Sequence, residues 1–155
     1  MKSRFFKNLT ETQTMELARQ TASLLPEGAN LALCGDLGSG KTHFAKGLGH
    51  GLGIPQGIWI TSPTFTLINH YQGADHKFYH ADLYRLGHED ELFEIGFYDL
   101  VKGPEILAVE WWDQFPGTYP EQIIKVILEK VSPITRNLQI QSEHPSFKAE
   151  QLNLL

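Results

Sequence analysis

The sequence predicts an α/β fold, a three-layer sandwich built on a mixed parallel and antiparallel sheet. A short apolar segment at residues 29–34 precedes a glycine-rich loop, and a segment with helical character follows that loop. The loop, residues 35–42, has the pattern G-x-x-x-x-G-K-[ST], which is expected between a strand and a helix. Later apolar segments are separated by turn residues, and some can pair as antiparallel neighbours. Together these features predict a sandwich of the P-loop NTPase type.

The first half of the chain gives the clearest local signals. A helix is predicted over residues 10–25, where Thr10 and Gln13 can form a capping box at its start. The apolar residues 29–34 predict a buried strand, and a second helix is expected to begin near Lys41. Each interior glycine costs a helix about 1 kcal/mol relative to alanine, so we expect this second helix to be short or held by close packing. The glycines concerned are Gly47, Gly49, Gly51 and Gly53.

The middle of the chain alternates apolar runs with turn residues. A short strand is predicted over residues 57–61 and a turn over residues 62–64. The apolar runs at residues 65–71 and 77–86 are predicted to form a hairpin. Residues 87–101 indicate one or two short helices broken at Gly96.

The last third is predicted to complete the sheet. Residues 105–112 have the continuous apolar character of a central strand with both faces covered. Residues 122–131 and 137–143 are predicted strands, and the alternation in the second is typical of an edge. Residues 144–155 fit either a short helix or a loose end.

Length, composition and charge limit the function classes. The chain has 155 residues, of which 41% are hydrophobic, and this fits a single domain over residues 1–155. The net charge of -5 disfavours tight, sequence-independent binding to the phosphate backbone of a nucleic acid. Cys34 is the single cysteine, the first residues lack the apolar core of a secretory signal, and no apolar run approaches about 18 residues. We therefore expect a soluble, cytoplasmic protein without membrane association.

The glycine loop is the first candidate site. Its backbone N–H groups can converge on phosphate oxygens, aided by the positive end of the helix that follows. Lys41 is expected to reach the β- and γ-phosphates, and the Thr42 hydroxyl is expected to ligate Mg²⁺. The loop residues are Gly35, Asp36, Leu37, Gly38, Ser39, Gly40, Lys41 and Thr42, and His43 follows them.

Two carboxylates lie where a P-loop protein needs an acid, at the end of a neighbouring strand. Glu110 ends one apolar run and Asp82 ends another. Either could instead cap a turn. Beside the P-loop, we favour Glu110 on Mg²⁺, because its strand is the more central, and Asp82 as a second acid near the γ-phosphate. The two roles could be exchanged.

Several other residues are weaker candidates. Ser62 and Thr64 could contact phosphate or Mg²⁺ as part of a sensing loop, or could cap an ordinary proline turn. Arg85 could bind the negatively charged phosphates, or it could form an ion pair with nearby Glu89 or Asp90. Trp111 and Trp112 point to opposite faces if the strand continues through them, leaving one for the core and one for a partner. The seven histidines lack compact metal-ligand spacing, so a zinc site is not expected.

The rest of the chain indicates which nucleotide is bound and which class of reaction is favoured. The base-recognition motif N-K-x-D of GTPases is absent from the sequence, which favours ATP. A small-molecule kinase also needs a substrate pocket and usually an arginine-bearing lid, for which the chain has little length left. An ATPase that acts on a partner is therefore favoured, with a free-standing small P-loop kinase and a non-catalytic nucleotide-binding scaffold as alternatives.

These residues resemble the TsaE (formerly YjeE) family of small bacterial P-loop ATPases. The resemblance runs from about residue 10 to about residue 140 and depends on an ordered set of motifs. They are GDLGSGKT at residues 35–42, SPTF at 62–65, HADLYRL at 80–86, ELFEIGF at 91–97 and VEW at 109–111.

The resemblance implies binding of ATP and Mg²⁺ and slow hydrolysis that regulates or resets a complex of TsaB and TsaD. That complex transfers a threonylcarbamoyl group to the adenosine beside the tRNA anticodon, so contact with tRNA is implied only through it. By position, Lys41 would grip phosphates, Thr42 and Glu110 would bind Mg²⁺, and Asp82 would be the second essential acid. The start of the first helix, at Thr10 and Thr12, and the late Arg136 align with the adenine side of the nucleotide. Ser39 replaces the usual alanine and His43 a frequent threonine, changes that the backbone cradle should tolerate.

Overall fold

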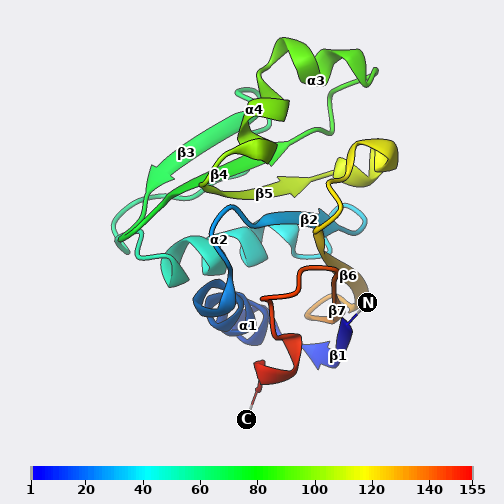
Figure 1. Cartoon of the computed structure of the whole chain (residues 1–155). Helices are drawn as coiled ribbons and strands as arrows, with labels where there is room; N and C mark the ends of the chain where they lie inside the picture. The colour runs from blue at the N-terminus through cyan, green and yellow to red at the C-terminus, as the bar shows by residue number, and fades with distance from the viewer. Residues whose placement is uncertain (1, 155) are drawn as a thin grey trace.

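The computed structural model of the chain, in which residues 2–154 are described, contains one seven-stranded sheet in the order β1-β7-β6-β2-β5-β4-β3 (Figure 1). The strands are β1 (Lys2–Leu9), β2 (Asn30–Cys34), β3 (Ile68–Gln72), β4 (Lys77–Asp82), β5 (Ile106–Glu110), β6 (Ile124–Ser132) and β7 (Thr135–Ser142). The four central strands β6, β2, β5 and β4 are mutually parallel, and antiparallel strands flank them on both sides. The predicted α/β class with a mixed sheet is confirmed.

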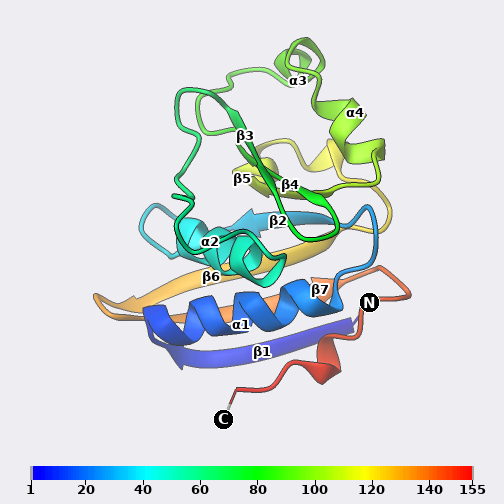
Figure 2. The same cartoon turned by 90° about the vertical axis from the view of Figure 1, so that its left-hand side faces the viewer.

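Helices cover both faces of this sheet. They are α1 (Glu11–Leu24), α2 (Lys41–Gly51), α3 (Asp90–Glu94) and α4 (Phe97–Lys102), with single 3-10 turns at Trp112–Gln114, Pro116–Thr118 and Ala149–Gln151. Helices α1 and α2 lie side by side over one face (Figure 2) and share a core with alternate residues of the strands, such as Ile106 and Ala108 of β5. The intervening Leu107 and Val109 face a second core with α3 and α4. Of the described helices, none is long and apolar enough to cross a lipid bilayer.

Local sequence signals explain most of these boundaries. Thr10 caps α1 through the predicted capping box, in which its hydroxyl accepts from the Gln13 N–H and the Gln13 side chain accepts from the Thr10 N–H. The β3–β4 hairpin and the break between α3 and α4 at Gly96 are also confirmed. Gly96 has φ 75°, a left-handed conformation that ends one helix before the other begins.

Helix α2 keeps its glycines because α1 lies directly against it. A Cβ added to Gly47 would lie 2.4 Å from the Met15 carbonyl oxygen and 2.6 Å from the Ala18 Cβ. The two helices therefore approach more closely than any side chain at this position would permit. This contact confirms the expectation that the glycine-rich helix is held by close packing.

Three predicted elements are wrong in their extent or position. Residues 57–61 form no strand, because Ile58 and Trp59 are turned toward solvent and only Ile60 packs inward. Strand β7 is not an edge, because the unpredicted strand β1 pairs with it along its outer side. Its alternation arises instead from having one face in the core and the other half exposed.

The third difference concerns the two tryptophans. Strand β5 ends at Glu110, and Trp111 has φ 64°, so the chain turns before Trp112. The prediction that the strand extends over residues 105–112 is therefore wrong, and the condition for placing the two indoles on opposite faces is not met. Trp112 is fully buried and its indole N–H donates to the Thr118 hydroxyl, 2.8 Å away, which makes it a core residue.

The C-terminal residues lie against the core. Within the described residues 144–154, the only helical segment is the short 3-10 turn Ala149–Gln151. Phe147, Ala149 and Leu152 are buried among the residues of the α1 side of the sheet. This segment covers apolar surface that β1 and α1 would otherwise leave open.

The contact between α1 and α2 gives a stability prediction. Replacing Gly47 with valine (G47V) forces the helices apart, and overpacking of this kind costs about 1–3 kcal/mol. The matched control is G57V, because a Cβ on Gly57 meets nothing within 4 Å. Urea unfolding should show a lower midpoint for G47V, with G57V near wild type. Equal midpoints for the two variants would contradict this packing.

Candidate nucleotide-binding site

The candidate site lies at the carboxyl ends of the parallel strands, where β2, β4 and β5 lead into loops. A pocket of about 530 Å³ opens there. Its wall includes the glycine loop, the two predicted carboxylates and part of the turn between β6 and β7. This is the edge at which ligands bind in open α/β sheets.

The glycine loop has the conformation that its sequence requires. Gly35, Gly38 and Gly40 have φ values of 148°, 78° and 109°. A Cβ on Gly35 would lie 2.5 Å from the Leu128 carbonyl oxygen, so no other residue fits there. Helix α2 starts at Lys41 without a side-chain cap, which leaves its first N–H groups free to bind an anion.

Lys41 is folded back onto the loop. Its Nζ donates to the carbonyl oxygens of Gly35 and Asp36, the latter at 3.1 Å, and lies 3.9 Å from the centre of the Trp111 ring. Burial lowers the pKa of Lys41, although the nearby carboxylates, Glu110 foremost, oppose this shift. The ammonium is thus held by neutral groups that a phosphate could replace.

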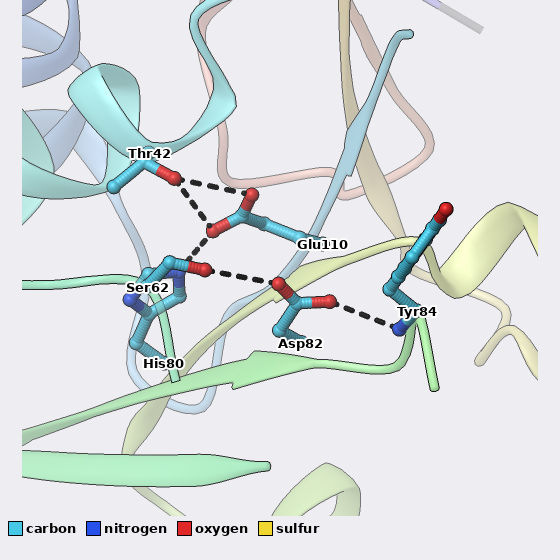
Figure 3. Close-up of polar contacts among 6 residues, drawn as sticks. All are labelled: Thr42, Ser62, His80, Asp82, Tyr84 and Glu110. Carbon is cyan, nitrogen blue, oxygen red and sulfur yellow. Dashed lines mark hydrogen bonds and ion pairs between the residues drawn. The ribbon is translucent and has the colours of Figure 1, made fainter. Parts of the chain in front are cut away.

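The two carboxylates lie next to each other because of the strand register. Asp82 ends β4 directly opposite Glu110 at the end of β5, and both side chains face α2 (Figure 3). The Thr42 hydroxyl lies 3.3 Å and 3.2 Å from the two carboxylate oxygens of Glu110. Asp82 accepts from the Ser62 hydroxyl at 3.0 Å and from the Tyr84 N–H at 2.9 Å. Thr42, Ser62 and both acids therefore form one polar cluster.

His80 was missed as a site residue from the sequence. Its Nε2 lies 2.6 Å from Glu110 Oε2, and its ring is fully buried. The available signal was strand alternation, since residues 80 and 82 of one strand point to the same face.

Arg136 lies in the pocket wall, and no ion pair is seen for it among the described residues. It is 7% exposed, and its Nε and Nη1 have no hydrogen-bond partner among the described residues. The buried hydroxyl of Ser39 is likewise unpartnered. A buried guanidinium remains charged and its desolvation is costly, so the wall favours an anionic ligand.

The remaining candidates divide between the pocket and its surroundings. Thr64 and Trp111 line the pocket, as does His43, whose Nε2 lies 3.1 Å from Glu11 Oε1. Thr10 instead caps α1 and Thr12 is exposed, so it is Glu11 between them that lines the pocket. Arg85 is exposed, with its guanidinium 4.3 Å from the centre of the Phe65 ring.

Several known proteins are similar to this chain. The family model described as threonylcarbamoyl adenosine biosynthesis protein TsaE matches residues 9–138. The chain is 33% identical over 138 residues to the tRNA threonylcarbamoyladenosine biosynthesis protein TsaE of Bacillus subtilis, covering 89% of this chain and 85% of that protein. It is 38% identical over 117 residues to the same-named protein of Treponema pallidum, covering 76% and 84%. The crystal structure of Bacillus subtilis YdiB superposes with a TM-score of 0.70 at 30% identity, covering 91% and 86%.

Cys34, the last residue of β2, tests how closed the core on the α3 and α4 side of the sheet is. Burial, and secondarily the charge of Asp113, raise its pKa to about 11. At pH 8 a thiol reagent should therefore react about 100-fold more slowly with the native protein than with the urea-unfolded chain, and the native rate should rise up to about pH 11. The variant C34S provides the blank. Similar rates for native and unfolded protein would mean that the thiol is accessible.

Proposed function

The chain belongs to the TsaE family of threonylcarbamoyl adenosine biosynthesis proteins, and we propose that it acts there as a slow ATPase that depends on Mg²⁺. In this proposal ATP binding and hydrolysis regulate or reset a complex of TsaB and TsaD, which transfers the threonylcarbamoyl group to tRNA. The chain meets tRNA only through that complex, consistent with its net charge of -5. The observation that carries the proposal is the convergence of Lys41, Thr42, Asp82 and Glu110 on one pocket.

The unpartnered polar groups of the pocket fit a nucleotide. Arg136 needs an anion, and the free N–H groups of α2 need acceptors. Phosphate oxygens satisfy both requirements. Arg136 lies beside the loop, because a Cβ on Gly40 would be 3.4 Å from its Nε. We therefore assign Arg136 to the nucleotide on the side of the loop away from Glu110.

The donor set near Thr42 fits Mg²⁺ bound together with phosphates. In the described residues no group of three or more His, Cys, Asp or Glu side chains is arranged to hold a metal ion alone. Mg²⁺ commonly takes one or two protein oxygens, with phosphates and water completing its octahedron. Thr42 and Glu110 would supply those oxygens, since they already lie within 3.3 Å of each other.

The other residues have separable tasks in hydrolysis. When bound, Mg²⁺ and ATP supply a polarised phosphoryl group whose developing charge must be stabilised. Lys41 would exchange the carbonyl oxygens of Gly35 and Asp36 for phosphate oxygens. Asp82 is fixed by Ser62 and the Tyr84 N–H, and its remaining lone pairs can orient an attacking water.

The chain by itself offers little to accelerate the reaction. Among the described residues that line the pocket, Arg136 is the single arginine, and it is buried in β7. Arg85 lies outside the pocket wall, over Phe65. A mobile arginine finger is worth about 10³–10⁵ in rate, so we expect slow hydrolysis alone and faster hydrolysis with TsaB and TsaD.

Arg136 gives a direct test of nucleotide binding. Replacing it with methionine (R136M) removes the buried charge, so affinity for ADP and ATP should fall about 10- to 100-fold, as expected for a charge-assisted hydrogen bond. The free protein should be no less stable, because an uncompensated buried charge is lost. The control R19M removes an exposed arginine of α1 that does not line the pocket. Calorimetric titration and urea unfolding measure both effects, and unchanged affinity in R136M would contradict the assignment.

Reconstituted tRNA modification tests the function. With TsaB, TsaD and the threonylcarbamoyl donor, product should stop near one equivalent per complex without this protein and continue through many turnovers with it. The variants K41A and E110A should fail to restore turnover. Stoichiometric transfer of the γ-phosphate to an acceptor without TsaB and TsaD would instead favour a kinase. Full turnover with a variant that cannot hydrolyse ATP would favour a scaffold.

A further inference from the structure

The described structure contains a buried histidine–carboxylate contact whose role the chemistry above does not explain. His80 and Glu110 lie on neighbouring parallel strands, and their side chains meet at 2.6 Å with both groups almost fully removed from solvent. Burying such a pair requires desolvation of the carboxylate, and the free-energy cost of this desolvation often exceeds the stability gained from the contact. A contact of this kind beside a metal ligand is typical of a group that orients the ligand.

The ring of His80 is fixed by its surroundings. It stacks on Phe78 of the same strand face, with ring centroids 6.3 Å apart and planes 10° apart. On the neighbouring strand β5, the residue paired with His80 is Ala108. Its small side chain leaves room for the imidazole to extend toward Glu110, two residues further along β5. Packing against Phe78 therefore restricts where Nε2 lies.

The environment also indicates which nitrogen carries the proton. Nδ1 is buried and has no hydrogen-bond partner in the described part of the chain. A proton on Nδ1 would be an unsatisfied buried donor, at a cost of about 1–3 kcal/mol. The proton therefore lies on Nε2, which donates to Glu110 Oε2.

We propose that His80 is a positioning residue that fixes the Glu110 carboxylate so that it can bind Mg²⁺ beside Thr42. The hydrogen bond to Oε2 stops rotation of the carboxylate and leaves Oε1, which lies 3.3 Å from the Thr42 hydroxyl, for the ion. Without this bond the carboxylate can turn away from the Thr42 hydroxyl, which lies 3.3 Å from Oε1 and 3.2 Å from Oε2. This inference rests on the proposed function only in taking Glu110 as a Mg²⁺ ligand.

The test compares two substitutions of similar size. In H80Q the amide N–H can reach the position of Nε2, whereas H80M fills the space without a donor. The readout is ADP affinity by calorimetric titration, with Mg²⁺ and with a chelator. H80M should weaken Mg²⁺ binding to the nucleotide complex about 10- to 100-fold, as is typical when an outer partner of a metal ligand is lost. H80Q should stay near wild type, and affinity without Mg²⁺ should stay within about twofold in both.

The outcomes separate the two proposals. Equal Mg²⁺ dependence in H80M and wild type would overturn the positioning role, as would an equal loss in H80Q and H80M. A wild-type protein that binds ADP equally well with and without Mg²⁺ would instead overturn the assignment of Glu110 itself.

A second measurement needs no variant and decides the matter if H80M does not fold. Long-range ¹H–¹⁵N spectra of the wild-type protein should report a proton on Nε2 of His80 and a bare Nδ1, with and without Mg²⁺ and ADP. A ring that carries its proton on Nδ1 and none on Nε2 would overturn the positioning role, because Nε2 could then not donate to Glu110.

Discussion

The register between β4 and β5 is the constraint on which the candidate site depends. Because Asp82 pairs directly with Glu110, two carboxylates end neighbouring parallel strands on the face that α2 covers. A slip of one residue in either strand would turn its acid to the opposite face. The same register places His80 opposite Ala108, within reach of Glu110. One strand pairing thus positions the candidate metal ligand, the second acid and the histidine that contacts Glu110.

Around this acidic pair the chain arranges positive groups that lack full partners. Lys41 rests on backbone carbonyls and α2 begins without a side-chain cap. Two nitrogens of Arg136 have no hydrogen-bond partner within residues 2–154. Each arrangement costs stability in the free protein, and each is relieved by the same kind of ligand, an anion with several oxygens. The two apolar cores on either side of the sheet offset this cost, since they bury most of the large aliphatic side chains.

The parts of the fold that the sequence predicts well are those with local causes. The capping box at Thr10, the glycine loop and the break at Gly96 depend on residues close in sequence. Strand β1 could not be predicted in this way, because its side chains are largely exposed and it exists through backbone pairing with β7, more than 120 residues away. Residues 57–61 give the opposite error: they have strand-like composition, but they pair with no strand and Trp59 stays exposed.

For the candidate site, the sequence by itself determined the glycine loop, Lys41, Thr42 and the two acids, because a contiguous motif and strand-end positions specify them. Only the tertiary structure decided which other residues join them. It brought in His80 through cross-strand packing, left Arg136 unpartnered against the loop, and turned the chain at Trp111 so that this indole covers Lys41. It also left Arg85 outside the pocket. Strand alternation indicates the face on which His80 lies. Its contact with Glu110 and the other outcomes depend on burial and on the pairing of distant strands, which no local pattern of residues encodes.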